Sequence, residues 1–120
     1  MKKKMILLLF FLSVVSAVIG TVTYTIHKKE KDLSFVELET DEERKILFYR
    51  DDCPDCKAVY PQVFFHNLRN RDTVFVNLNQ QKNRRYISKY QIKTVPTIIH
   101  KDQRYEGMDQ KQIQEFLKKE

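Results

Sequence analysis

Acidic residues, cysteines and histidines are few or unevenly placed in this 120-residue chain. Its first 31 residues contain one acid, Glu30, beside six lysines, and the whole chain has only two cysteines and three histidines. A chain of this length has room for one domain, which excludes multidomain enzymes and repeat arrays. An apolar share of 42% is ordinary for a globular chain and excludes a disordered one.

The formal net charge of +6 comes almost entirely from the head of the chain. From Asp32 onward, 16 basic residues face 15 acidic ones. A nearly neutral domain is a poor partner for nucleic acid, so we expect no nucleic-acid binding. The basic run 82–85 is interpreted as a solvated helix start.

Charge is absent between Met5 and Ile26. These 22 residues form a helix of about 33 Å at roughly 1.5 Å per residue, against a hydrocarbon core of about 30 Å. The remainder is too small to cover such a helix on all sides, so a buried core helix is excluded. The sequence predicts a basic tail, membrane anchor and linker over residues 1–31 and a domain over residues 32–120.

A cleaved secretory signal is the alternative to the anchor, and it would make the domain a secreted one. Small residues are present, but they form no good A-x-A cleavage pattern and no cysteine follows as a lipoprotein site: Ser13, Ser16, Ala17 and Gly20. Lysines flank both ends of the run, so the positive-inside rule says little about the orientation of the helix in the membrane. Short N-terminal tails normally stay in the cytoplasm, which places the domain outside the membrane, where disulfides are permitted.

From Asp32 the pattern alternates between strands and helices. Three β-prone runs are predicted strands: residues 45–49, 74–78 and 95–100. Helical spacing predicts a first helix with its apolar face through Cys56, Val59, Tyr60, Val63, Phe64 and Leu68, a second over 84–90, and a third beginning at an Asp109 N-cap. The aromatic residues are interpreted as core or groove lining: Tyr60, Phe64, Phe65 and Phe75. This predicts an α/β fold, a central mixed sheet flanked by helices.

Three smaller features complete the expected fold. Residues 101–105 are expected to turn and return as an antiparallel edge strand. Gly107 permits the bend into the last helix. Leu33 to Leu38 is predicted to form one more short strand.

The two cysteines lie together as Cys53-Pro54-Asp55-Cys56, after a predicted strand and at the start of a helix. Free N–H groups and the helix dipole stabilise a thiolate at Cys53, and Cys56 is one turn away, where it can close a disulfide. Cys53 is therefore the candidate nucleophile and Cys56 the resolving thiol. Pro54 suits the first helical turn because its missing N–H would have no partner there.

The chain resembles the thioredoxin-like family over residues 33–119. The resemblance rests on the strand 46–49 before the cysteines, on Pro61 eight positions after Cys53, and on the segment Thr94-Val95-Pro96-Thr97. It implies that Pro96 follows a cis peptide bond and faces the cysteines, and that the Val95 backbone pairs with a bound substrate chain. Thr94 and Tyr49 are expected to line the same groove, with Pro54 and Asp55 supporting the site.

Two departures from the family pattern bear on the chemistry. Leu47 stands where thioredoxins carry a buried carboxylate, and Asp52 where they carry tryptophan. Three acids crowd the helix start: Asp51, Asp52 and Asp55. Either they raise the thiolate pKa of Cys53 and make the pair reducing, or they are solvated caps with small, screened effects.

Metal binding is the chemical rival, because a lone C-x-x-C is also half of a zinc site. His27, His66 and His100 complete no paired-ligand spacing with the cysteines, so we expect no metal. His66 is interpreted as a surface or half-buried helix residue, and His100 as a strand-end residue. No cofactor is expected beyond a redox-active Cys53–Cys56 disulfide.

Two function classes remain open. The first is a membrane-tethered, extracytoplasmic thiol–disulfide oxidoreductase, a monomer that acts on protein thiols and disulfides and needs a recycling partner. Small anchored members of this kind resemble the bacteriocin transport accessory proteins and other thioredoxins of the bacterial cell envelope. The second is a non-catalytic module of a secretion or transport machine, which uses the groove beside Val95 to hold a partner.

Overall fold

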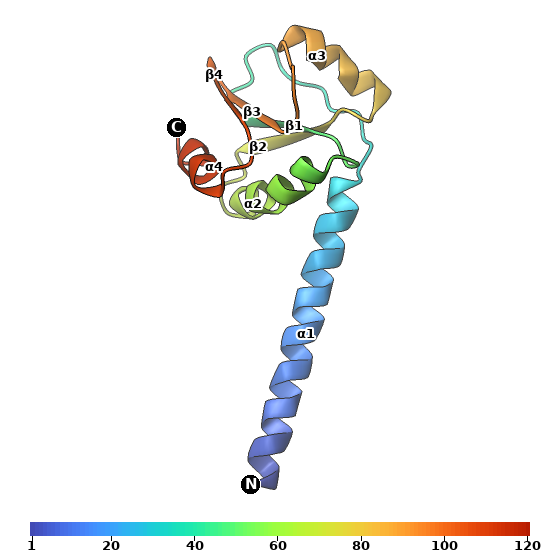
Figure 1. The fold of residues 1–120 in the computed structure, drawn as a ribbon, viewed down its shortest axis with the longest axis vertical. Helices are drawn as coiled ribbons and strands as arrows, with labels where there is room; N and C mark the ends of the chain where they lie inside the picture. Colours follow the sequence, from blue (N-terminus) through green and yellow to red (C-terminus); the bar gives the residue numbers. More distant parts are fainter.

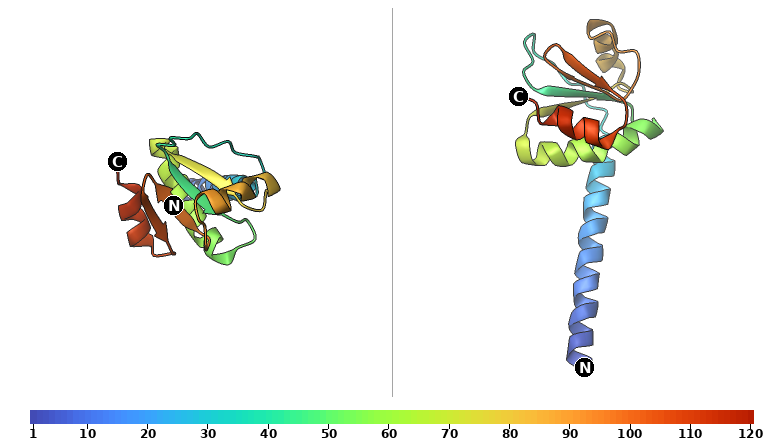
Figure 2. Two further views of the ribbon diagram at one scale, coloured as in Figure 1. Left: turned by 90° about the horizontal axis from the view of Figure 1, so that it is seen from above. Right: turned by 60° about the vertical axis from the view of Figure 1, so that its left-hand side comes forward.

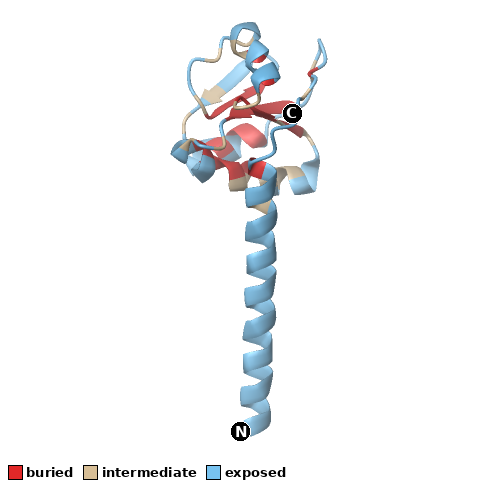
Figure 3. Cartoon of the chain, turned by 90° about the vertical axis from the view of Figure 1, so that its right-hand side faces the viewer, coloured by how far each residue is buried: buried red, intermediate tan, exposed pale blue.

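The computed structural model describes all residues 1–120 as a long helix carrying a small domain at its C-terminal end (Figure 1). Helix α1, Lys2–Glu30, gives the molecule a longest extent of 64 Å. By length and composition it is the one helix apolar enough to cross a membrane. Figure 3 shows that it is exposed along almost its whole length, whereas the buried residues gather in the domain.

The domain is built on a four-stranded mixed sheet in the order β2-β1-β3-β4. The strands are β1, Lys45–Tyr49; β2, Thr73–Asn77; β3, Thr97–His100; and β4, Gln103–Glu106. β1 pairs in parallel with β2 and antiparallel with β3, and β3 pairs antiparallel with β4. The predicted α/β fold with a mixed sheet and a return edge strand is confirmed.

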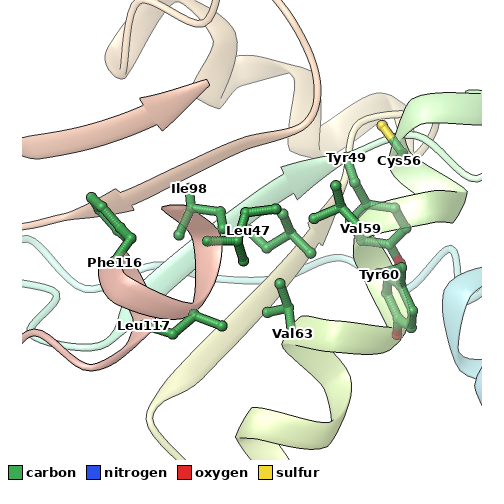
Figure 4. Close-up of a cluster of buried hydrophobic side chains, with 10 residues drawn as sticks. Leu47, Tyr49, Cys56, Val59, Tyr60, Val63, Ile98, Phe116 and Leu117 are labelled. Atoms are coloured by element: carbon green, nitrogen blue, oxygen red, sulfur yellow. The ribbon is translucent and has the colours of Figure 1, made fainter. Parts of the chain in front are cut away.

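Helices cover both faces of the sheet (Figures 1 and 2). On one face α2, Pro54–Asn70, and α4, Gln110–Leu117, pack on Leu47, Tyr49 and Ile98 in one core cluster (Figure 4). On the other face η1, Gln81–Arg84, and α3, Arg85–Lys89, lie over a second cluster that holds Ile46 and Phe48. Alternate residues of β1 serve opposite faces, so the whole strand is buried.

The turn into α4 has the predicted chemistry. Gly107 has a φ of +144°, and a Cβ there would lie 2.9 Å from the Tyr105 hydroxyl, so a side chain has neither the conformation nor the space. Asp109 then caps α4 by accepting a hydrogen bond from the Gln112 N–H at 2.9 Å.

The strand predicted over Leu33 to Leu38 is wrong, because this segment has no strand partner. Its backbone bonds to side chains instead. The Val36 N–H donates to Asn83 Oδ1 at 3.0 Å, and the Leu38 N–H donates to the Tyr86 hydroxyl at 2.9 Å. Leu38 is buried by this arrangement.

The apolar face predicted on the first helix is wrong at Leu68, which is 59% exposed and lies outside the set that packs on the sheet. The aromatic residues interpreted as core or groove lining agree with the structure. Tyr60 is buried, and Phe64 and Phe75 are half-buried against the core. Phe65 is 46% exposed and lines a groove with α1.

The end of α1 is bound to the domain rather than loosely linked. The Tyr49 hydroxyl donates to the Glu30 carbonyl at 2.9 Å, and Asn77 Nδ2 donates to the Asp32 carbonyl at 3.3 Å. Ile26 packs against the core cluster, and Glu30 is buried. Two strands thus hold the last turn of α1, which fixes the direction of the helix relative to the sheet.

Candidate redox site

Cys53 occupies the N-cap of α2, directly after the loop that leaves β1. Its backbone is extended, with φ −93° and ψ 120°, and its sulfur accepts a hydrogen bond from the Cys56 N–H at 3.3 Å. A sulfur therefore takes the place of the oxygen that usually caps a helix. Pro54 fills the first helical position without losing a hydrogen bond.

The two thiols have different surroundings. Cys53 is half-buried, whereas Cys56 is 1% exposed and belongs to the core cluster with Val59 and Tyr60 (Figure 4). Burial, together with the neighbouring Cys53 thiol, raises the pKa of Cys56 to about 12. A reagent therefore reaches Cys53 first, and Cys56 stays a protonated thiol near neutral pH.

The segment before β3 lies beside Cys53. The peptide bond between Val95 and Pro96 is cis, and the Val95 carbonyl oxygen is 4.0 Å from the Cys53 sulfur. Pro96 is buried, Val95 is half-buried and Thr94 is exposed. This arrangement places a partly exposed length of backbone next to the half-buried Cys53 thiol.

Two of the three acids near Cys53 share one partner. Asn79 Nδ2 donates to Asp52 Oδ1 at 2.8 Å and also to Asp51 Oδ1. The hydrogen bond from Asn79 holds the pKa of Asp52 below its usual value. Asp55 is exposed in the first turn of α2, near its positive end.

Tyr49 is the one predicted groove residue that the structure places elsewhere. It is 2% exposed, its ring packs against Tyr60 with centroids 5.0 Å apart, and its hydroxyl bonds to Glu30. As the last residue of a central strand it points toward α2, so its expected place in the substrate groove is wrong. The other predicted residues gather around Cys53 or at the start of α2: Pro54, Asp55, Cys56 and Val95.

Asn79 is the residue that sequence reasoning missed. A signal for it exists, because β1 and β2 are parallel and their carboxyl ends share one edge of the sheet. Asp51 follows β1 by two residues and Asn79 follows β2 by two. Recognising the pair requires knowing that these two strands are neighbours.

Comparison with known proteins agrees with this geometry. The thioredoxin family model matches residues 25–119, and the chain belongs to the thioredoxin family. The match begins within the last turns of α1, before the domain boundary predicted at residues 31 and 32. No curated protein and no solved structure matches the chain. Family membership and the two neighbouring cysteines support a thioredoxin-like redox role.

Proposed function

We propose that the protein is a membrane-tethered, extracytoplasmic thiol–disulfide oxidoreductase of protein substrates. The observation that carries this proposal is the Cys53 sulfur at the N-cap of α2, which accepts the Cys56 N–H at 3.3 Å and lies 4.0 Å from the Val95 carbonyl. A half-buried thiol that substrate can reach, a buried partner one turn away and an adjacent backbone segment are the parts that disulfide exchange needs.

The reaction transfers two electrons from the protein to a substrate disulfide. The Cys53 thiolate attacks one substrate sulfur, the substrate S–S bond breaks, and the second sulfur leaves as a thiolate that takes up a proton. Cys56 then loses its proton and attacks the Cys53 sulfur, which breaks the mixed disulfide and releases the first substrate sulfur as a thiol. The products are a substrate dithiol and a Cys53–Cys56 disulfide, which a separate recycling partner must reduce.

The raised pKa of Cys56 determines which thiol attacks first in this reaction. A protonated, buried Cys56 cannot compete with Cys53 for the incoming disulfide. Meanwhile an extended substrate segment pairs with the backbone at Val95, with Thr94 at the exposed end of the same segment. Docking holds the mixed disulfide in place while Cys56 becomes the second nucleophile.

We assign the net direction to reduction or exchange rather than strong oxidation. Asp51, Asp52 and Asp55 place negative charge around the helix start, which moves the potential toward the reducing end of the family range, about −270 mV, and away from about −120 mV. Equilibration with glutathione measures the potential directly. A value above roughly −180 mV, that of disulfide isomerases, contradicts this assignment.

The location of the domain relative to the membrane is inferred from α1. The apolar helix, with lysines before it and its end bound to the domain, supports a single-pass anchor in a bacterial cell membrane with residues 32–120 outside. If the helix is a signal sequence instead, the domain is secreted. In both cases the protein acts as a monomer, needs no cofactor besides its own disulfide and binds no nucleic acid.

Reduction of insulin by dithiothreitol, with the full chain in detergent, tests catalysis. The wild type is expected to accelerate insulin precipitation, and Cys53→Ser is expected to abolish the acceleration. Asp102→Asn, in the β3–β4 turn, is a matched control that should leave the rate unchanged. An inert wild type that still binds a partner would instead identify a non-catalytic accessory module.

A further inference from the structure

A groove of about 450 Å³ lies between α1 and α2 where the long helix meets the domain. Apolar side chains of both helices form most of its wall: Val18, Ile19, Val22 and Ile26 from α1, and Pro61 and Phe65 from α2. Phe65 remains 46% exposed, so the groove opens to the surroundings of the helix. Figures 1 and 2 show α2 crossing over the end of α1.

One face of α2 is turned toward this junction. Pro61, Phe65 and Leu68 follow one another at the spacing that places residues on a single helix face. Leu68 is 59% exposed and borders a second hollow together with Lys29 of α1. This α2 face therefore presents exposed apolar side chains beside a basic residue of the anchor, Lys29.

The position of the groove along α1 indicates which molecule fills it. Val18 and Val22 lie eight and four residues before Ile26, or about 12 and 6 Å along the helix at roughly 1.5 Å per residue. In the membrane-spanning arrangement of the proposed function, on which this step rests, the apolar run of α1 fills a hydrocarbon layer of about 30 Å. The α1 wall of the groove then lies inside the lipid-facing part of the helix, where the surroundings are acyl chains.

The upper end of the groove is polar. His27 and Glu30 line it, and Glu30 Oε1 is buried without a hydrogen-bond partner in a residue that is 6% exposed. An oxygen of this kind accepts a hydrogen bond from a hydroxyl or ammonium group. Lys28 and Lys29 of α1 are exposed at this level, where lipid phosphates lie.

We propose that the groove holds the acyl chain of a membrane lipid, with its headgroup toward Glu30, and that the α2 face carrying Phe65 and Leu68 lies in the membrane interface. An amphipathic helix in this position buries its apolar face at the boundary between headgroups and chains, and aromatic residues favour that level. Because Cys53 caps the same helix, the position of α2 in the membrane interface fixes the redox site at one height above the membrane.

The chain contains no tryptophan, so a single introduced one is a unique fluorescent reporter. The full chain with Phe65→Trp is reconstituted in phosphatidylcholine–phosphatidylglycerol vesicles whose acyl chains are brominated near the glycerol end. The matched control is Phe35→Trp. Phe35 is 39% exposed, and its ring packs under the Arg85 guanidinium of α3, on the other face of the sheet.

The brominated lipid is expected to reduce the emission of Phe65→Trp to less than half of its value in unbrominated vesicles, and to leave that of Phe35→Trp unchanged. Leu68→Trp, at a more exposed position of the same face, is a second reporter that spares the groove and should also be quenched. Equal emission of Phe65→Trp and Leu68→Trp in both lipids would overturn the proposal.

Flotation of the same samples distinguishes a failure of the lipid groove from a failure of the membrane tether. Protein that floats with the vesicles but is not quenched is tethered to the membrane, but its helix α2 does not lie in the membrane interface. Protein that does not float with the vesicles overturns both the tether and the lipid groove. Insulin reduction by the floated variants confirms that each one is folded.

Discussion

The backbone N–H of Cys56 donates to the Cys53 sulfur at 3.3 Å, while the side chain of Cys56 is buried in the core. One helical turn therefore holds two thiols of unequal reactivity. The N-cap sulfur receives a hydrogen bond and is only half-buried, and the second sulfur has its pKa raised to about 12, mainly by burial. This difference supports the proposed order of attack in disulfide exchange.

Alkylation as a function of pH measures the difference directly. In Cys53→Ser, the remaining Cys56 should react negligibly with iodoacetamide near neutral pH, because burial still raises its pKa, and its rate should rise only at strongly alkaline pH. In Cys56→Ser, Cys53 should react at neutral pH. Comparable neutral rates in the two variants would contradict the assignment of Cys53 as the attacking thiol.

The three acids near Cys53 are expected to lower the redox potential. Replacing Asp51, Asp52 and Asp55 together by asparagine removes negative charge from the helix start, so the potential should become less negative. Solvated caps with screened effects of a few tenths of a kcal/mol each would change the potential by at most about 20 mV, so a larger change is expected if the charges act on the sulfur. Equilibration with glutathione gives the value, and Asp102→Asn is the control. An unchanged potential would show that the carboxylates are solvated caps without influence on the sulfur.

An ion pair at the other end of the sheet contributes to stability. Lys45 Nζ lies 2.7 Å from Asp72 Oδ2, and His66 Nε2 lies 2.9 Å from Asp72 Oδ1. Burial acts to raise the pKa of Asp72, but the hydrogen bonds from Lys45 and His66 outweigh it and hold this pKa below its usual value. The Lys45 side chain is only 6% exposed, so its charge depends on this partner.

Asp72→Asn should therefore cost about 1–3 kcal/mol of unfolding free energy at neutral pH, measured by denaturation of the full chain in detergent. A lowered carboxyl pKa stabilises the fold above the unfolded value of about 3.9 and loses this effect as the pH falls through the folded value. The gap between wild type and variant should thus shrink in acid. Glu106→Gln, which breaks an exposed pair with Arg104, should cost less than about 1 kcal/mol. A gap that is constant down to acidic pH would contradict the role of the charge.

The hydroxyl of Tyr49 holds the last turn of α1. Tyr49→Phe keeps the ring packing on Tyr60 and removes the hydrogen bond to the Glu30 carbonyl, so it should cost about 1 kcal/mol of unfolding free energy. Amide hydrogen exchange should also become faster in the last turn of α1. Tyr24→Phe, at an exposed position of α1, should change neither quantity. A Tyr49→Phe variant with wild-type stability and exchange would mean that the junction does not depend on this bond.

Local sequence patterns predicted most of the fold, because a buried strand is marked by consecutive apolar residues and a helix start by its capping residue. The bounds of β1 were predicted as observed, since all five of its residues are buried. The segment Leu33 to Leu38 has the same β-prone composition, but its backbone partners are side chains of Asn83 and Tyr86, nearly fifty positions away. No local pattern contains that information.

The same distinction applies to the site. Cys53, Pro54 and Cys56 form one local motif, and their placement at the start of a helix follows from the sequence. The position of Tyr49 depends on the end of α1 reaching under the sheet to meet its hydroxyl. Asn79 depends on the order of strands in the sheet. Both required the arrangement of elements that are distant in the sequence.

Trapping of mixed disulfides is the most direct test of the central claim, that Cys53 attacks substrate disulfides and Cys56 resolves them. The full chain with Cys56→Ala, expressed in a bacterial host, is expected to accumulate covalent adducts that a reductant releases on a gel. Cys53→Ser should accumulate none. Adducts through Cys56 in Cys53→Ser, or none in Cys56→Ala although the folded protein is present, would contradict this account.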